Sequence, residues 1–138
     1  MNRTVELTRV YHFSAAHQLV NPALSASDNA ALYGQCARPH GHNYYLEVTV
    51  AGVPDPTTGF AVDLVALDRE VTERLLAQVD HHRLEDAPGL AGVITTGEGL
   101  ARAFWRTLAG ALPPGLLRRV VVHETAKNQF EYRGEEAA

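Results

Sequence analysis

Three histidines have the residue type and spacing that bind a transition metal. His40 and His42 are separated by one glycine at the start of a predicted strand, so both imidazoles point to the same side of it. His17 ends the apolar face of an earlier strand. If the two strands are neighbours, three neutral nitrogen ligands converge and leave a fourth position open, as in catalytic zinc sites. Zinc suits imidazole best and iron is an alternative; the simplest alternative is a set of polar residues at strand ends.

The only cysteine of the chain, Cys36, lies four positions before His40. A lone cysteine is usually a small buried hydrophobic residue. Here it lies in a predicted loop with Arg38, beside imidazoles that would hold a dication, and that environment favours a thiolate able to act as base or nucleophile. As a fourth metal ligand, the thiol would instead close the site and remove the chemistry. The residues alone leave all three interpretations open.

Two further positions carry groups that can move protons or bind a polar ligand. Asp80 and His81 end a predicted helix, where the helix dipole and the adjacent carboxylate favour a protonated imidazole. The pair suits a general acid or a proton relay, although a solvated helix end is the simpler interpretation. Glu124 shares a strand face with two valines, and a carboxylate there needs a partner. A guanine-like ring edge would satisfy both oxygens; otherwise Glu124 only marks where the strand becomes exposed.

Hydrophobic periodicity predicts the elements that must position these residues. Extended segments are expected at residues 4–17, 40–50, 118–125 and 130–132, with 60–62 resuming the extended chain to form a hairpin. One helix should begin after an N-cap at Asp63 and end at residue 79, and a short helical turn is expected within 28–33. A second helix should begin at Thr95, with Glu98 at capping-box spacing. Residues 134–138 are expected to form a frayed tail.

The element order strand-strand-helix-helix-strand-strand predicts an α+β fold. Its economical form is a four-stranded antiparallel sheet with both helices on one face. A chain of 138 residues and 15.0 kDa is most simply one domain, residues 1–138, which buries about two-thirds of its unfolded surface. No linker, repeat or low-complexity segment is evident in the sequence.

Composition excludes several classes of partner. The net charge is −4 with no basic run, so we expect no nucleic acid partner. No stretch approaches the ~20 apolar residues of a membrane span, and the first ten residues lack a signal-peptide core. A single cysteine cannot form an internal disulfide, which fits a reducing cytoplasm. We therefore expect a cytoplasmic protein that binds neither nucleic acid nor a membrane.

Six motifs together resemble one known family. In chain order they are HFSAAH, CARPHGHNYYLEV, DPTTG, VDHHRL, TTGEGLARAFW and VVVHETAKNQFEYRGE. They are similar to the 6-pyruvoyl-tetrahydropterin synthase / 6-carboxy-tetrahydropterin synthase family over nearly the whole chain. The resemblance implies the tunnelling fold, in which subunits close their sheets into a barrel and form homohexamers of two stacked trimers with active sites between subunits. It also implies zinc and the substrate 7,8-dihydroneopterin triphosphate, from which triphosphate is eliminated.

The resemblance assigns a role to each candidate residue. The zinc ligands would be His17, His40 and His42. The proton-transfer set would be Cys36, Asp80 and His81. The pterin ring would be held by Glu124 with help from Thr95 and Thr96. One departure from the family pattern is Gly99, where relatives usually carry asparagine, and it is expected to loosen the turn behind Thr96.

Two branches of the family differ near the cysteine. The three residues between Cys36 and His40 resemble the carboxy-forming enzymes of the queuosine pathway. The segments LSASDNAALYG and DPTTG are instead similar to the pyruvoyl-forming enzymes of the tetrahydrobiopterin pathway. Because the cysteine spacing lies at the chemistry, we expect a zinc-dependent lyase of the carboxy-forming type, with the pyruvoyl-forming type as the alternative.

Two interpretations come from other classes of protein. Gly34, His40, His42 and Glu47 are similar to the first motif of cupins, which are all-β metal proteins, but the predicted amphipathic helices disfavour that fold. A non-catalytic metal- or ligand-binding domain is the second alternative. It would have no need for Cys36 together with the Asp80–His81 pair.

Overall fold

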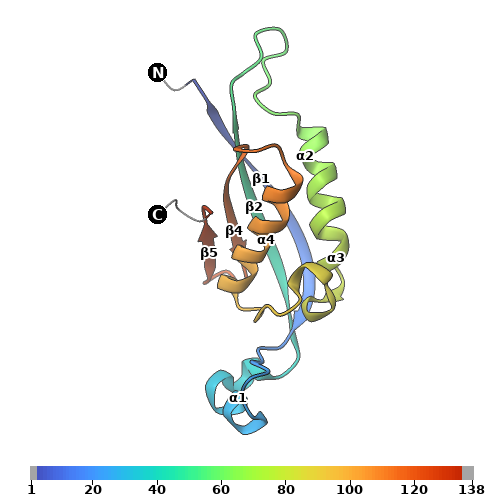
Figure 1. Cartoon of the computed structure of the whole chain (residues 1–138), viewed down its shortest axis with the longest axis vertical. Coiled ribbons are helices and arrows are strands. Elements are labelled where there is room, and N and C mark those ends of the chain that lie inside the picture. The colour runs from blue at the N-terminus through green and yellow to red at the C-terminus, as the bar shows by residue number, and fades with distance from the viewer. Residues whose placement is uncertain (1–2, 135–138) are drawn as a thin grey trace.

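The computed structural model describes residues 3–134, which form a five-stranded sheet with helices on one face (Figure 1). The strands lie in the order β3-β1-β2-β4-β5. They are β1 (Val5–His17), β2 (His40–Gly52), β3 (His82–Arg83), β4 (Leu117–His123) and β5 (Gln129–Tyr132). The α-helices are α1 (Ala26–Tyr33), α2 (Leu64–Val71), α3 (Ala77–Val79) and α4 (Gly97–Ala111). Short 3-10 turns cover Gly34–Ala37, Leu84–Asp86 and Pro88–Leu90, and a π-helical segment, Thr72–Leu76, joins α2 to α3.

The α+β class is confirmed, but the predicted four-stranded antiparallel sheet is wrong in one respect. The two-residue strand β3 pairs in parallel with β1, which makes the sheet mixed. The backbone N–H of His81 donates to the Ser14 carbonyl at 2.6 Å and brings the chain to this edge. A strand of two residues is too short to produce an alternating pattern, so the sequence carried no signal for it.

The predicted hairpin strand at residues 60–62 is also wrong. Asp55 instead organises a compact turn, since its Oδ1 accepts hydrogen bonds from the backbone of Thr57 at 2.7 Å and Thr58 at 3.0 Å. The chain then passes so close to Gly52 that a Cβ there would lie 2.1 Å from the Ala61 carbonyl oxygen. This Asx-type turn, closed by the backbone hydrogen bonds from Gly59 N–H to the Asp55 carbonyl and from Asp55 N–H to the Phe60 carbonyl, takes the place of the expected strand.

The helices begin largely where the capping residues predicted. Asp63 caps α2 by accepting from the Ala66 N–H at 3.1 Å, and helical structure continues to Val79. The predicted capping box at Thr95 is wrong, because the N-cap of α4 is Thr96, whose hydroxyl accepts from the Gly99 N–H at 3.1 Å. Both threonines can cap a helix, and the sequence did not distinguish them.

The core lies between the sheet and the helices α2 and α4. Phe13 of β1 stacks on Tyr44 of β2, with ring centroids 4.7 Å apart, and Phe104 of α4 meets Phe13 edge-on at 5.9 Å. All three side chains are buried. Their packing fixes the β1–β2 register, in which His17 pairs directly with His40. Because a one-residue slip would turn every side chain to the other face, the aromatic core also places the histidines.

Three features complete the outline of the chain. The short helix α1 lies beyond the end of the sheet, next to the turn that leads into β2 (Figure 1). Among residues 3–134, no helix combines the length and the apolarity that a membrane crossing needs. The expected frayed tail lies, from Glu135 onward, outside the described residues.

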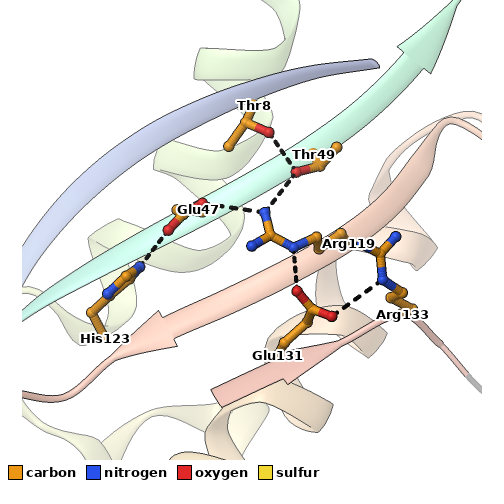
Figure 2. Close-up of polar contacts among 7 residues, drawn as sticks. All are labelled: Thr8, Glu47, Thr49, Arg119, His123, Glu131 and Arg133. Carbon is orange, nitrogen blue, oxygen red and sulfur yellow. Dashed lines mark hydrogen bonds and ion pairs between the residues drawn. The ribbon is translucent and has the colours of Figure 1, made fainter. Parts of the chain in front are cut away.

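The helix-free face of the sheet carries a network of charged side chains (Figure 2). Arg119 on β4 contacts Glu47 on β2 at 3.2 Å and Glu131 on β5 at 2.5 Å. His123 pairs with the second oxygen of Glu47, and Arg133 pairs with Glu131 at 3.2 Å. The network links the three strands β2, β4 and β5.

We expect this network to add stability that is lost in acid. Burial raises the pKa of Glu47, but hydrogen bonds from His123 and Arg119 outweigh it, so the pKa lies below its ordinary value of 4.5. The Arg119 hydrogen bond likewise lowers the pKa of Glu131. A lowered folded-state pKa means that the contribution is complete above about pH 4.5 and disappears as the pH falls through the folded-state values.

Urea denaturation at a series of pH values checks this. The free energy of unfolding should fall below about pH 4.5, and Arg119→Gln should flatten part of that fall. Arg106→Gln, which changes an exposed arginine on α4, is the matched control and should leave the acid dependence unaltered. An Arg119 variant with the same acid dependence as the unmodified protein would contradict the assignment.

Candidate metal centre and active-site cleft

The structure brings His17, His40 and His42 together at the end of the β1–β2 pair. One ligating nitrogen from each histidine lies within 4.8 Å of the others, a separation that one ion can span. The ring centroid of His17 lies 4.4 Å from that of His40 and 5.1 Å from that of His42. His17 is 2 % exposed, whereas the other two are half-buried. The three histidines can therefore hold a metal ion with one side open to the surface.

Hydrogen bonds set which nitrogen faces the centre in two of the three rings. His17 Nδ1 lies 2.9 Å from the Thr95 carbonyl oxygen, and His40 Nδ1 lies 2.7 Å from the Arg38 carbonyl oxygen. Each Nδ1 must carry the proton that it donates, so each Nε2 is unprotonated and has a lone pair to offer. Burial lowers the pKa of His17 to about 4 and also lowers that of His42. Neutral imidazoles with fixed tautomers are the form that zinc requires.

The histidines share a cavity with the predicted thiol and carboxylate. Its volume is about 270 Å³, and it is lined by His17, Leu19, Gln35, Cys36, His40, His42 and Glu124. Cys36 is exposed within the turn Gly34–Ala37, which follows α1. Glu124 follows the end of β4 on the opposite side of β2 from β1. Segments far apart in sequence thus bring a thiol, a carboxylate and three imidazoles to one open cavity.

Asp80 and His81 lie together but do not line this cavity. His81 Nδ1 is 2.9 Å from Asp80 Oδ1, and the same oxygen accepts the Ser14 N–H at 2.9 Å. The hydrogen bond from Ser14 is the main reason that the pKa of Asp80 is lowered. His81 has a φ of 60° and a side chain that is 81 % exposed. It lines a second surface depression, which shares His42 with the cavity of Cys36 but does not contain the thiol.

The two threonines occupy supporting positions in the described structure. Thr95 is 2 % exposed and contacts His17, while the Thr96 side chain caps α4. A Cβ at Gly99 would lie 2.1 Å from the Ile94 carbonyl oxygen. The loop before α4 therefore packs tightly against this glycine, which is the opposite of the loosening expected from its helix propensity.

Two residues of the site escaped the sequence reasoning. The Tyr44 hydroxyl donates to His17 Nε2 at 3.4 Å, and burial raises the pKa of this tyrosine, which therefore stays a neutral phenol. Glu85 accepts a hydrogen bond from the Thr95 hydroxyl at 3.1 Å. Tyr44 shares the strand face of His40 and His42, so strand periodicity contained that signal. Glu85 lies in the short 3-10 turn Leu84–Asp86, and the sequence gave no signal for its role.

Comparison with known proteins gives consistent matches along the chain. The sequence profile of the 6-pyruvoyl tetrahydropterin synthase family matches residues 6–135. The 6-pyruvoyl tetrahydrobiopterin synthase of Poecilia reticulata is 44% identical over 132 residues, which cover 94% of this chain and 90% of the relative. The human protein of that name is 40% identical over 133 residues, covering 94% and 92%. The solved structure of Caenorhabditis elegans 6-pyruvoyl tetrahydropterin synthase superposes with a TM-score of 0.90 at 36% identity, covering 98% and 100%.

These matches correct two expectations. The carboxy-forming interpretation, which rested on the short spacing from Cys36 to His40, is wrong, because the relatives at 37–44% identity carry the pyruvoyl name. That spacing lies in a surface connection, where residues can be lost without moving the strands on either side. The all-β cupin alternative is also wrong, since α4 alone contains 15 helical residues. The chain belongs to the 6-pyruvoyl tetrahydropterin synthase family.

Proposed function

We propose that this protein is a zinc-dependent 6-pyruvoyl-tetrahydropterin synthase, a lyase that eliminates triphosphate from 7,8-dihydroneopterin triphosphate. The observation that carries the proposal is the single cavity shared by the three histidines, Cys36 and Glu124. The names of the relatives support the choice of this branch.

The side chains of the cavity would have separate roles in this reaction. A zinc ion on the three histidines would supply a Lewis acid that polarises the substrate's side-chain oxygens and acidifies the adjacent C–H bonds. The Cys36 thiol, exposed in the same cavity, takes or returns the proton at those carbons. Glu124 accepts two N–H donors from the pterin ring and so fixes the substrate's orientation.

We further propose that the Asp80–His81 dyad acts from a neighbouring subunit of a homohexamer. In one chain, neither residue lines the cavity of Cys36, and the dyad sits at the β3 edge of the sheet. A second copy placed against this edge would present the dyad to another cavity and also cover the exposed strand. A sedimentation profile with only monomer at micromolar concentration would contradict this arrangement.

The direct test is incubation of the purified zinc-loaded protein with 7,8-dihydroneopterin triphosphate. We expect release of inorganic triphosphate and a product with the mass of 6-pyruvoyl-tetrahydropterin. Any other pterin product would contradict the proposal. Binding of the substrate without triphosphate release would instead indicate a non-catalytic binding domain.

Replacing Glu124 with glutamine should weaken substrate binding. The amide keeps the shape of the side chain but exchanges one acceptor for a donor, which leaves a buried ring N–H unpaired. The expected cost is about 1–3 kcal/mol, or roughly 5- to 150-fold in affinity. Calorimetric titration of a Cys36→Ala background with the substrate measures it without turnover. Glu73→Gln, an exposed carboxylate on the helical side, is the control; equal affinities for both variants would leave Glu124 without a binding role.

A further inference from the structure

A partly buried chain of hydrogen bonds lies behind the three histidines. It runs from His17 Nδ1 to the Thr95 hydroxyl oxygen at 3.2 Å, and from that hydroxyl to Glu85 Oε1 at 3.1 Å. The Thr95 hydroxyl has one proton, which it donates to Glu85. Its lone pairs therefore face the N–H of His17, which also donates to the Thr95 carbonyl at 2.9 Å.

Glu85 is held in this position from two sides. Its Oε1 also accepts the backbone N–H of Gln18 at 2.9 Å, directly after the end of β1. The carboxylate thus bridges the end of the strand that carries His17 and the loop that carries Thr95. Both contacts fix the direction in which the His17 ring points.

The second oxygen of Glu85 provides an independent observation. Oε2 is buried and accepts no hydrogen bond from any residue in the range 3–134. A buried carboxylate oxygen without a donor is costly unless a positive charge lies nearby. A dication on the ligand that Glu85 already supports would provide that charge.

We propose that Glu85 is a positioning residue of the metal centre, acting through the Thr95 hydroxyl to orient His17 and to balance the charge of the bound zinc. The inference rests on the proposed function, because it assumes that the histidines hold zinc. Outer partners of this kind commonly change metal affinity by about 10- to 100-fold.

A merely structural role is the competing explanation, since Glu85 also ties down Gln18. Glu85→Gln separates the two, because an amide oxygen can still accept both hydrogen bonds while the charge is removed. Thr95→Val removes the hydroxyl and keeps the side-chain shape, and Thr95→Ser restores a hydroxyl. Asp86→Asn removes an exposed charge from the neighbouring position and serves as the matched control.

The measurement is zinc affinity by competition with a chelating dye, with the melting temperature of the zinc-free protein recorded in parallel. We expect Glu85→Gln and Thr95→Val each to weaken zinc binding about 10- to 100-fold. Thr95→Ser should recover most of the loss, and Asp86→Asn should stay within about twofold of the unmodified protein. Because Glu85 acts through Thr95, the double variant should bind no more weakly than the weaker single variant.

Each outcome decides between distinct conclusions. Zinc affinity in Glu85→Gln equal to that in Asp86→Asn would overturn the inference while leaving the proposed function intact. Multiplicative losses in the double variant would also overturn it, since they would mean that the two residues act independently. Lower melting temperatures with unchanged zinc affinity would establish the structural role instead. Failure of the unmodified protein to bind zinc would overturn the inference together with the proposed function.

Discussion

The variant Cys36→Ala should keep its zinc, its fold and its substrate binding and lose most of its turnover. General acid–base steps contribute about 10²- to 10⁴-fold, and the loss should be of that order. The side chain is exposed in the cavity, so alanine leaves no void in the core. The Cys36 carbonyl oxygen accepts a hydrogen bond from the Leu19 N–H at 2.7 Å. This contact belongs to the backbone, so the substitution leaves it unchanged. The melting temperature of the variant should therefore differ little from that of the unmodified protein.

Zinc content, melting temperature and turnover of this variant separate the three roles that the sequence left open. Loss of zinc would identify Cys36 as a fourth ligand and contradict the proton-transfer role. Loss of stability with full activity per folded molecule would identify a packing residue, which the exposure of Cys36 already disfavours. Cys36→Ser is the matched comparison: a hydroxyl has nearly the thiol's shape but is a far weaker acid, so its turnover should also be low.

The clustering of His17, His40 and His42 was predictable because these residues follow strand geometry. The i, i+2 spacing of His40 and His42 fixes their common face whatever the partner strand is. The position of His17 opposite His40 depends on register, which the sequence does not state directly. Phe13 and Tyr44 set that register, and both belong to the alternating apolar pattern, so the same pattern that predicted the strands also aligned the histidines.

The remainder of the site depends on contacts that leave no periodic signal. Glu85 reaches Thr95 across ten positions from a 3-10 turn, and the cap of α4 shifted by one residue because adjacent threonines are equivalent in the sequence. His81 adopts a positive φ, which is uncommon for residues other than glycine and is not announced by the sequence. Its hydrogen bond to Ser14 reaches a strand nearly seventy residues earlier.

The choice between the two branches of the family shows another limit of prediction from the sequence. The short Cys36–His40 spacing changes only the connection between the turn that carries the thiol and β2. The structure still places Cys36 in the cavity of the three histidines. A local spacing therefore carried less information about the branch of the family than similarity over the whole chain.

Replacing His42 with alanine should abolish zinc binding at working concentrations, and with it turnover. Two imidazoles remain, and a site with two protein ligands binds zinc far more weakly than the three-ligand sites of zinc enzymes. The apo protein should keep its melting temperature, because His42 is only half-buried and the aromatic core lies deeper along the same strands. Added zinc should stabilise the unmodified protein by about 2.7 kcal/mol at a free concentration of 100 times Kd, and should not stabilise the variant.

His12→Ala provides the control for this prediction. His12 is an exposed histidine of β1 that lies on the other face of the sheet, where its ring meets Tyr45 at 5.2 Å. Its removal takes away one imidazole of seven without touching the centre, so metal content and the zinc-induced rise in melting temperature should persist. Metal analysis and melting curves with and without zinc measure both effects. Near-stoichiometric zinc in a variant lacking both His40 and His42 would show that the ion binds elsewhere, and the assignment of this centre would then be wrong.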